Sequence, residues 1–159
     1  MIVEGGTPRA LTLDELDDLE ARVDAWAGHQ LADNDAVVAV DRGEPGQRRW
    51  YVRLRGEERE TLAVWFTVQQ RTLAYETYVM PAPEEGHAEL YEYLLRHNRS
   101  LYGASFAIGA EDAIYIVGQF PAEAVTEDEL DRILGSLYAW TEHHFRAALR
   151  IGFASRFVG

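Results

Sequence analysis

Three consecutive segments between residues 48 and 80 alternate apolar and polar side chains, and this alternation limits the possible folds more than any other feature of the chain. The apolar positions in the three segments are Trp50, Val52 and Leu54; Leu62, Val64, Phe66 and Val68; and Leu73, Tyr75, Thr77 and Val79. A period of two places such side chains on one face of a β-strand. The connections at residues 56–59 and 70–71 are short, which predicts antiparallel hairpins. These segments are therefore expected to form an antiparallel sheet with one buried face.

Three helices are predicted around these strands. The first begins at a capping box in which Thr12 and Glu15 satisfy backbone donors, and Gly28 predicts its end near residues 28–30. A second helix is expected over residues 84–99, and a third starts at another capping box, residues 126–129. The side chains of the second helix that are expected to face the sheet are Leu90, Tyr91, Leu94, Leu95 and Leu101. On the third helix, the apolar stripe passes through either Trp140 or Thr141.

Two further strands are predicted at residues 104–108 and 113–118, on either side of a turn at residues 109–112. The short apolar pattern of residues 36–41 leaves open whether they add another strand. The predicted order is α-β-β-β-α-β-β-α. Such an order favours an α+β sandwich, in which helices cover an antiparallel twisted sheet.

The length of 159 residues fits a single domain, expected over residues 12–155 between a flexible N-terminus (1–11) and a tail (156–159). The chain has no Cys, which excludes disulfides, iron–sulfur clusters, thiolate zinc sites and cysteine nucleophiles. Its net charge of −12 argues against nucleic acid as a partner, because phosphate binding needs a basic face. All 15 basic residues are Arg, which indicates a GC-rich bacterial genome.

Targeting and membrane signals are not apparent in the sequence. Residues 1–10 lack the apolar core of a signal peptide. The longest apolar runs, residues 36–40 and 62–66, are far shorter than the roughly 20 residues of a membrane helix. We therefore expect a cytoplasmic protein that does not bind membranes.

No motif of a catalytic or metal-binding site is found. No two of the five His residues are spaced i and i+4, and His143 and His144 are expected to interact with the C-terminus of the last helix. Ser105 and Ser136 lack the glycine pattern of a nucleophile elbow. Glu76 is the one carboxylate among large apolar groups, and we expect it to face an arginine rather than act as an acid. The sequence thus predicts no enzyme activity, no catalytic residue, no metal and no cofactor.

Arginine is concentrated where the strands are predicted. Residues 36–83 carry 7 of the 15 Arg and a net charge of +1, whereas residues 1–35 carry −7 and residues 84–159 carry −6. Four side chains would line one face of a single strand: Arg49, Tyr51, Arg53 and Arg55. Two interpretations remain open. The arginines could pair internally with the acidic helices or protect an exposed edge, or they could form a recognition strip whose guanidinium groups engage carboxylates of a protein partner.

The second helix and the following strand carry the pattern LL..N..L....F, formed by Leu94, Leu95, Asn98, Leu101 and Phe106. This pattern resembles the signature of the YbjN-domain family, bacterial proteins related in fold to type III secretion chaperones. The segments at residues 50–54, 79–81, 114–121 and 128–134 also resemble that family in the same order. The resemblance covers about residues 12–155. It implies a chaperone-like α/β sandwich that is often dimeric and has no known catalysis, in a family labelled as sensory-transduction regulators.

The residues of this pattern also have a physical interpretation of their own. Leu94 and Leu95 are expected to bury the helix against the sheet. Asn98 tolerates the left-handed conformation or caps a helix end with its amide, so we expect its role to be structural.

The leading functional hypothesis is a non-enzymatic protein-binding module, a chaperone-like or regulatory adaptor that forms a homodimer and binds a protein segment on its sheet face or edge. One alternative is a small-ligand sensor or weak hydrolase with a pocket between helix and sheet. The residues expected to line that pocket are Trp65, Tyr75, Glu76 and Tyr78. Another alternative is a structural subunit with a constant partner.

Overall fold

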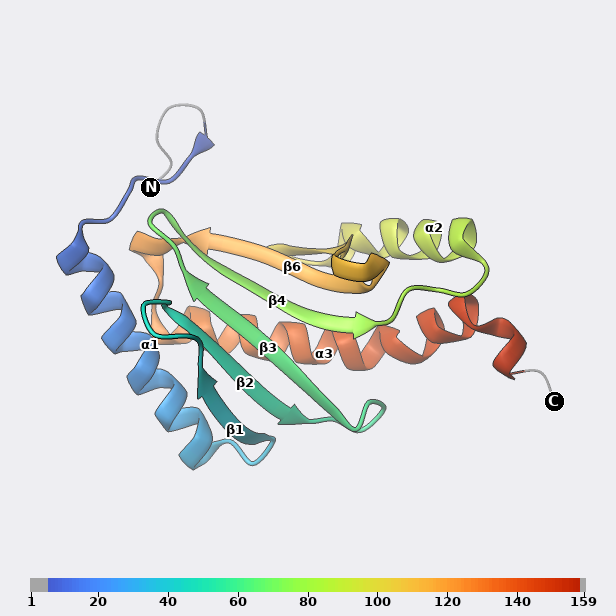
Figure 1. Cartoon of the computed structure of the whole chain (residues 1–159), viewed down its shortest axis with the longest axis horizontal. Coiled ribbons are helices and arrows are strands. Elements are labelled where there is room, and N and C mark those ends of the chain that lie inside the picture. Colours follow the sequence, from blue (N-terminus) through green and yellow to red (C-terminus); the bar gives the residue numbers. More distant parts are fainter. Residues whose placement is uncertain (1–5, 158–159) are drawn as a thin grey trace.

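The structure is a computed structural model that describes residues 6–157. Its α-helices and strands follow one another as α1 (Leu13–Asp33), β1 (Val37–Arg42), β2 (Arg49–Arg55), β3 (Thr61–Val68), β4 (Thr72–Met80), α2 (His87–His97), β5 (Ala104–Ile108), β6 (Ile114–Pro121) and α3 (Glu127–Gly152) (Figure 1). The α+β class and the order of helices predicted from the sequence are confirmed.

The six strands form one antiparallel sheet in the order β1-β2-β3-β4-β6-β5. Residues 36–41, whose sequence pattern is compatible with a strand or a loop, lie almost entirely in β1, so four strands rather than three precede α2. β1 forms one edge of the sheet by pairing with β2. β5 forms the other edge, because β6 lies between it and β4.

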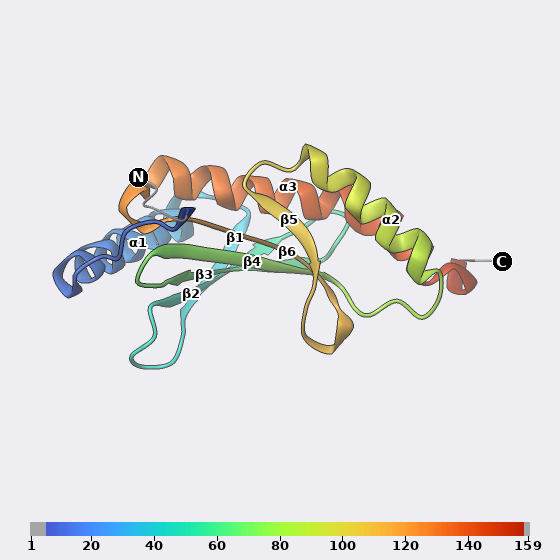
Figure 2. The same cartoon turned by 90° about the horizontal axis from the view of Figure 1, so that it is seen from above.

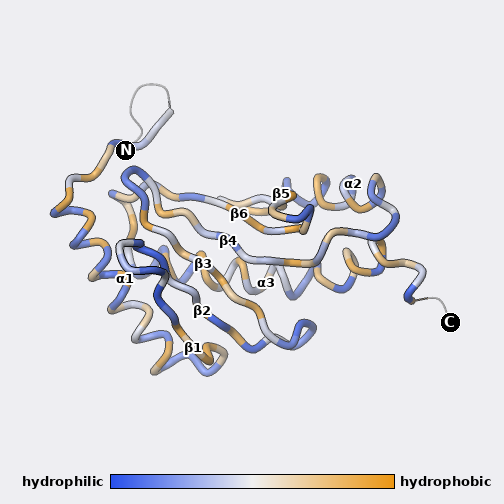
Figure 3. The backbone as a smooth tube through the Cα atoms, viewed as in Figure 1, coloured by the Kyte–Doolittle hydropathy of each residue, from blue (hydrophilic) through white to orange (hydrophobic). Residues whose placement is uncertain are grey.

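All three α-helices lie on the same side of the sheet (Figure 2). α3 runs along the sheet, α1 covers its β1 end, and α2 packs beside α3 near β5 (Figures 1 and 2). The side chains of β2, β3 and β4 that were predicted to be buried point toward these helices and form the core. Figure 3 shows the alternation of apolar and polar residues along these strands. The opposite side of the sheet, which we call the open face, is covered by no α-helix of residues 6–157.

The prediction that α1 ends near Gly28 is wrong, because the helix continues to Asp33. A side chain at Gly28 would meet only open space, so no neighbouring residue requires a glycine at this position. A glycine inside a helix costs only about 1 kcal/mol relative to alanine. Asn34 ends the helix instead: its N–H bonds the Gln30 carbonyl, and its side chain accepts a hydrogen bond from the N–H of Ala36. The capping box at Thr12 and Glu15 is confirmed.

The prediction for the buried face of α2 is half right. Leu94 is 4% exposed and packs in the core, but Leu95 is 68% exposed. Adjacent residues on a helix point about 100° apart, so a helix that packs at the edge of the sheet buries one of the two leucines. Leu90 and Leu94, one turn apart, take the buried positions.

Candidate functional site

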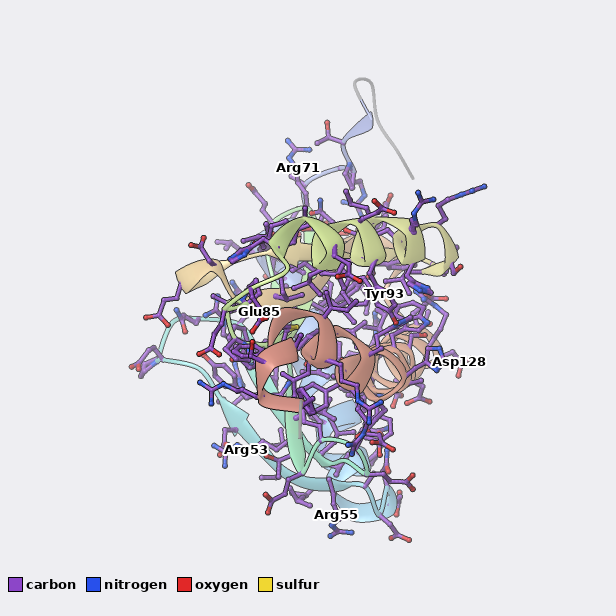
Figure 4. The ribbon with its side chains drawn as sticks, turned by 90° about the vertical axis from the view of Figure 1, so that its right-hand side faces the viewer. Arg53, Arg55, Arg71, Glu85, Tyr93 and Asp128 are labelled. Carbon is purple, nitrogen blue, oxygen red and sulfur yellow. The ribbon has the colours of Figure 1, made fainter. Side chains whose placement is uncertain are left out.

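The open face places the predicted recognition strip on one surface. Arg49, Tyr51, Arg53 and Arg55 alternate with the buried residues of β2 and so point away from the helices. Arg53 and Arg55 extend outward from the sheet in Figure 4. Along one row of the sheet, Tyr51 lies opposite Trp65, Trp65 opposite Glu76, and Glu76 opposite Val117.

Aromatic rings form a chain across this face. The ring centroids are 5.9 Å apart between Tyr51 and Trp65, 6.4 Å between Trp65 and Tyr115, and 5.6 Å between Tyr115 and Tyr78. All four side chains are half-buried. Aromatic side chains that stay partly accessible on a sheet face are typical of protein-binding surfaces, since they offer a large contact area at little entropic cost.

Some arginines of the strand region pair internally with an acidic helix, whereas others lie on the open face, where a partner could reach them. Arg42 and Arg48 lie toward the helices and pair with acidic residues of α1, with N–O distances of 2.8–3.0 Å to Asp17, Glu20 and Asp24. Internal pairing with an acidic helix therefore holds for these two residues.

The arginines of the open face differ. Arg53 is 3.2 Å from Asp41, which is also exposed. Arg49 donates from Nε to the Thr67 hydroxyl at 3.0 Å. Within residues 6–157, neither Arg49 nor Arg55 has a carboxylate within ion-pair distance. Two guanidinium groups of the predicted strip are thus available to an external acid.

Glu76 lies in the middle of the open face, at a hollow of about 140 Å³. The hollow is lined by Trp65, Thr67, Ala74, Tyr75, Glu76, Val117 and Gly118. Burial raises the pKa of the Glu76 carboxyl, and the positive charge of Arg49 opposes that shift. The expected arginine is present only at a distance, because Glu76 has no ion pair or hydrogen bond within the described part of the chain.

The pocket predicted between helix and sheet is wrong in its placement. Trp65, Glu76 and Tyr78 all belong to the open face, which no helix covers. Tyr75 points the other way and is 3% exposed, and its hydroxyl donates to the Gly103 carbonyl at 2.6 Å. Because Tyr75 alternates with Glu76 along β4, these four side chains cannot line one pocket beneath a helix.

Asn98 links α2 to the edge strand β5. Its Oδ1 accepts a hydrogen bond from the Phe106 N–H at 2.6 Å, and its Nδ2 faces the Phe106 carbonyl at 3.5 Å. These contacts are consistent with the structural role expected for Asn98, whose backbone is right-handed helical (φ −55°) and not left-handed. Two residues of the LL..N..L....F pattern are therefore direct hydrogen-bond partners.

An apolar groove of about 360 Å³ lies between α2 and β5. The residues that line it are Tyr91, Leu94, Leu95, Asn98, Phe106, Ala107 and Ile108. Leu95 and Ile108 at its border are 68% and 53% exposed. β5 itself carries no charged residue, whereas charged side chains are the usual protection of a sheet edge.

A histidine cluster beneath this groove was missed by the sequence reasoning. His144 is 4% exposed, and its Nδ1 lies 2.8 Å from the Tyr93 hydroxyl, which sits between α2 and α3 (Figure 4). The rings of His97 and His143 are each 4.6 Å from that of His144, and Phe106 approaches it from β5. Burial, followed by the nearby histidines, lowers the pKa of His144 to about 4.

The expected interaction of His143 and His144 with the helix C-terminus is wrong, because α3 continues to Gly152. A signal for burial was present in the sequence: position 144 continues the stripe of residues 130, 133, 137, 141 and 148, all buried in α3. The same stripe passes through Thr141, which resolves the choice between Trp140 and Thr141.

No group of three or more His, Asp or Glu side chains in residues 6–157 is arranged to hold a metal ion. No helix in that range combines the length and the apolar character needed to cross a bilayer.

The chain resembles uncharacterized mycobacterial proteins. It is 36% identical over 104 residues to one from Mycobacterium tuberculosis, a match that covers 65% of this chain and 57% of that protein. It is 33% identical over 128 residues to one from Mycobacterium leprae, with coverage of 80% and 70%. The chain thus spans little more than half the length of the first of these relatives. Their source agrees with the high-GC bacterial origin expected from the arginine content.

Solved structures share the fold at low sequence identity. A chain of the ExsC–ExsE complex has a TM-score of 0.57 and 16% identity, with 80% of this chain and 94% of that chain covered. A chain of the HopA1–SchA chaperone–effector complex has a TM-score of 0.55 and 14% identity, with 86% and 98% covered. A chain of the ExoU–SpcU complex from the type III secretion system of Pseudomonas aeruginosa has a TM-score of 0.52 and 13% identity, with 81% and 96% covered. The fold is that of type III secretion chaperones.

The family follows from a match to the YbjN model, which is described as "Putative bacterial sensory transduction regulator" and spans residues 29–149. These residues include all six strands, α2 and most of α3. The LL..N..L....F pattern lies inside the matched range. The chain therefore belongs to the YbjN family.

Proposed function

We propose that this protein is a non-enzymatic, chaperone-like or regulatory adaptor of the cytoplasm that holds a segment of a protein partner on its open face. The observation that carries the proposal is the open face, where four half-buried aromatic rings lie beside guanidinium groups with no carboxylate partner in residues 6–157. Aromatic residues and Arg are the side chains most enriched in binding hot spots. The solved complexes of the same fold include a chaperone with its effector, which supports protein binding as the role.

Replacing Arg49, Tyr51 and Arg53 together with Ser is expected to abolish partner capture, because it removes the ring at one end of the aromatic chain and two of the three strip guanidinium groups. The whole chain would be used for affinity capture from the native cell, followed by mass spectrometry. An unchanged circular dichroism spectrum would show that the variant is folded. A matched control replaces Arg146 and Arg150, which are exposed on α3, and should capture partners as the wild type does.

Site-specific cross-linking ties the captured partner to the face. A photoreactive residue in place of Ala63, which lies opposite Arg53 on the open face, should cross-link the partner. The same residue in place of Ala147, which is exposed on α3, should not. Capture that survives the triple substitution, or cross-links that form only at Ala147, would contradict the proposed face.

We also propose that the protein self-associates along the groove between α2 and β5, with a second copy as the occupant. The support is an uncharged edge strand next to an apolar groove with exposed Leu95 and Ile108. A patch that contains both a groove and protruding apolar side chains can be self-complementary, as a two-fold interface requires. Burial of such side chains is the main favourable term in association.

Light scattering at tens of micromolar is expected to give a mass twice the 18.0 kDa of the chain. Ile108→Lys should convert the dimer to a monomer, because it places a charge in the apolar groove that the second copy would have to bury. Leu13→Glu changes another exposed leucine, on α1, and serves as the matched control that should stay dimeric. A monomeric mass for the wild type would count against self-association.

A further inference from the structure

Two opposite charges lie at or beside the hollow on the open face without touching each other. Glu76 is half-buried and lines the hollow, whereas Arg49 lies beside it and donates from Nε to the hydroxyl of the lining residue Thr67 at 3.0 Å. No ion pair joins Arg49 and Glu76. A half-buried charge without a partner is unfavourable, since protein charges removed from water are normally paired.

The register of the strands fixes how far apart these charges lie. Arg49, Thr67 and Ala74 form one row across β2, β3 and β4, while Tyr51, Trp65 and Glu76 form another. The two rows are offset by two residues along the strands, or about 7 Å. Arg49 and Glu76 also lie two strands apart, or roughly 10 Å across the sheet, and the Arg49 side chain covers part of this distance by reaching Thr67.

The size of the hollow limits what can enter it. A site for a complete small-molecule ligand usually measures roughly 300–1,000 Å³, whereas this hollow measures about 140 Å³. The hollow is therefore large enough for the head group of one side chain. Trp65 belongs to its wall, and a cation that lies over the face of an indole ring is attracted by the quadrupole of the ring.

We propose that the segment held on the open face carries an opposite-charge pair, a cationic side chain that enters the hollow to meet Glu76 and a carboxylate that meets Arg49. This inference rests on the proposed function and specifies the chemistry of the partner. Two side chains at positions i and i+2 of an extended segment lie on the same side about 7 Å apart, which matches the offset between the two rows. Glu76 selects the cationic residue of such a segment, and Arg49 selects the acidic residue beside it.

Four short peptides test the charge pair. The first is acetyl-Lys-Gly-Glu-amide, the second and third replace Lys with norleucine or Glu with Gln, and the fourth carries both replacements. Each is titrated into the full chain labelled with ¹⁵N and ¹³C, up to about 10 mM, where a millimolar Kd is measurable. The resonances to follow are those of the Trp65 indole, the Val117 methyl groups and the Gly118 amide.

The doubly charged peptide is expected to bind at least about fivefold more tightly than the uncharged one, the gain typical of an exposed charge contact. In Glu76→Gln, the peptide with Lys should no longer bind more tightly than the one with norleucine, while the peptide with Glu should still bind more tightly than the one with Gln. In Arg49→Gln, the gain in affinity from Lys should remain and the gain from Glu should be lost. Asp41→Asn is the matched control, because Asp41 lies on the same face and already pairs with Arg53. Asp41→Asn should leave the gain in affinity from Lys and the gain from Glu unchanged.

A second measurement needs no variant. The pKa of Glu76, followed through its carboxyl carbon, should fall when the Lys peptide is added, because a cation stabilises the carboxylate. Equal binding of charged and uncharged peptides, no saturable shift with any peptide, or an unchanged pKa of Glu76 at saturation would overturn the charge pair. If the uncharged peptide still shifts Trp65 while the charges have no effect, the open face binds protein segments and only the charge pair fails.

Discussion

Replacing Asn98 with Ala is expected to lower the free energy of unfolding by about 2 kcal/mol, because the part-buried N–H of Phe106 then loses its acceptor and stays unsatisfied. The substitution removes the side-chain amide that joins the end of α2 to the edge strand β5. Urea unfolding followed by circular dichroism at neutral pH measures the change. Hydrogen exchange should show the Phe106 amide losing protection before the amides of β3.

Asn98→Asp is the informative control for this link. It keeps an oxygen acceptor for the Phe106 N–H at 2.6 Å and loses only the long contact of 3.5 Å with the carbonyl. It should therefore retain most of the stability that Asn98→Ala loses. If both variants unfold at the wild-type urea concentration, the bond between Asn98 and Phe106 does not stabilise the fold.

Mild acid is expected to destabilise the protein by up to about 3 kcal/mol through His144 alone. Burial lowers the folded-state pKa of His144 from 6.5 to about 4. Above pH 6.5 the imidazole is neutral in both the folded and the unfolded chain, and it makes no pH-dependent contribution. As the pH falls from 6.5 to 4, the unfolded chain binds a proton that the folded chain does not, so stability decreases through this window. Urea unfolding at pH 7.5 and at pH 4.5 tests the decrease.

The groups that face His144 belong to three elements, namely Tyr93 and His97 on α2, His143 on α3 and Phe106 on β5. His144→Phe removes the titrating ring at similar volume, and its stability should fall less between the two pH values. His143→Gln changes the exposed neighbour and should keep most of the wild-type decrease. An equal decrease in the wild type and in His144→Phe would show that other groups cause the acid sensitivity.

The sheet was predictable because its pattern is local. Alternation over residues 48–80 identifies the three central strands and their buried faces without knowledge of the rest of the fold, and all of those assignments are confirmed. The same alternation separates Arg48 from Arg49, which point to opposite sides of the sheet. That separation explains why one pairs with α1 and the other does not.

The predictions are wrong where tertiary packing decides between residues whose local sequence patterns are equivalent. Leu94 and Leu95 are equally apolar, and only the position of α2 at the sheet edge selects Leu94 for burial. The open face could not be predicted, because the sequence pattern does not show that all three helices pack on the same side of the sheet. The hollow between Arg49 and Glu76 depends on the register of two consecutive hairpins, which fixes the row of each residue. His144 was assigned by its nearness to the chain end, although its helical position already marked it as buried.

The strand order has a consequence for synthesis on the ribosome. β1 to β4 emerge in the order in which they pair, so each hairpin can close as soon as its second strand is free. β5 emerges before β6, its ladder partner, and must wait for it. α3, which covers the apolar face of the sheet, comes last. The nascent chain therefore exposes an unpaired strand until residue 121 has left the exit tunnel, and the part of the apolar sheet beneath α3 until residue 152 has left it. During this interval, aggregation or capture by cellular chaperones would compete with folding.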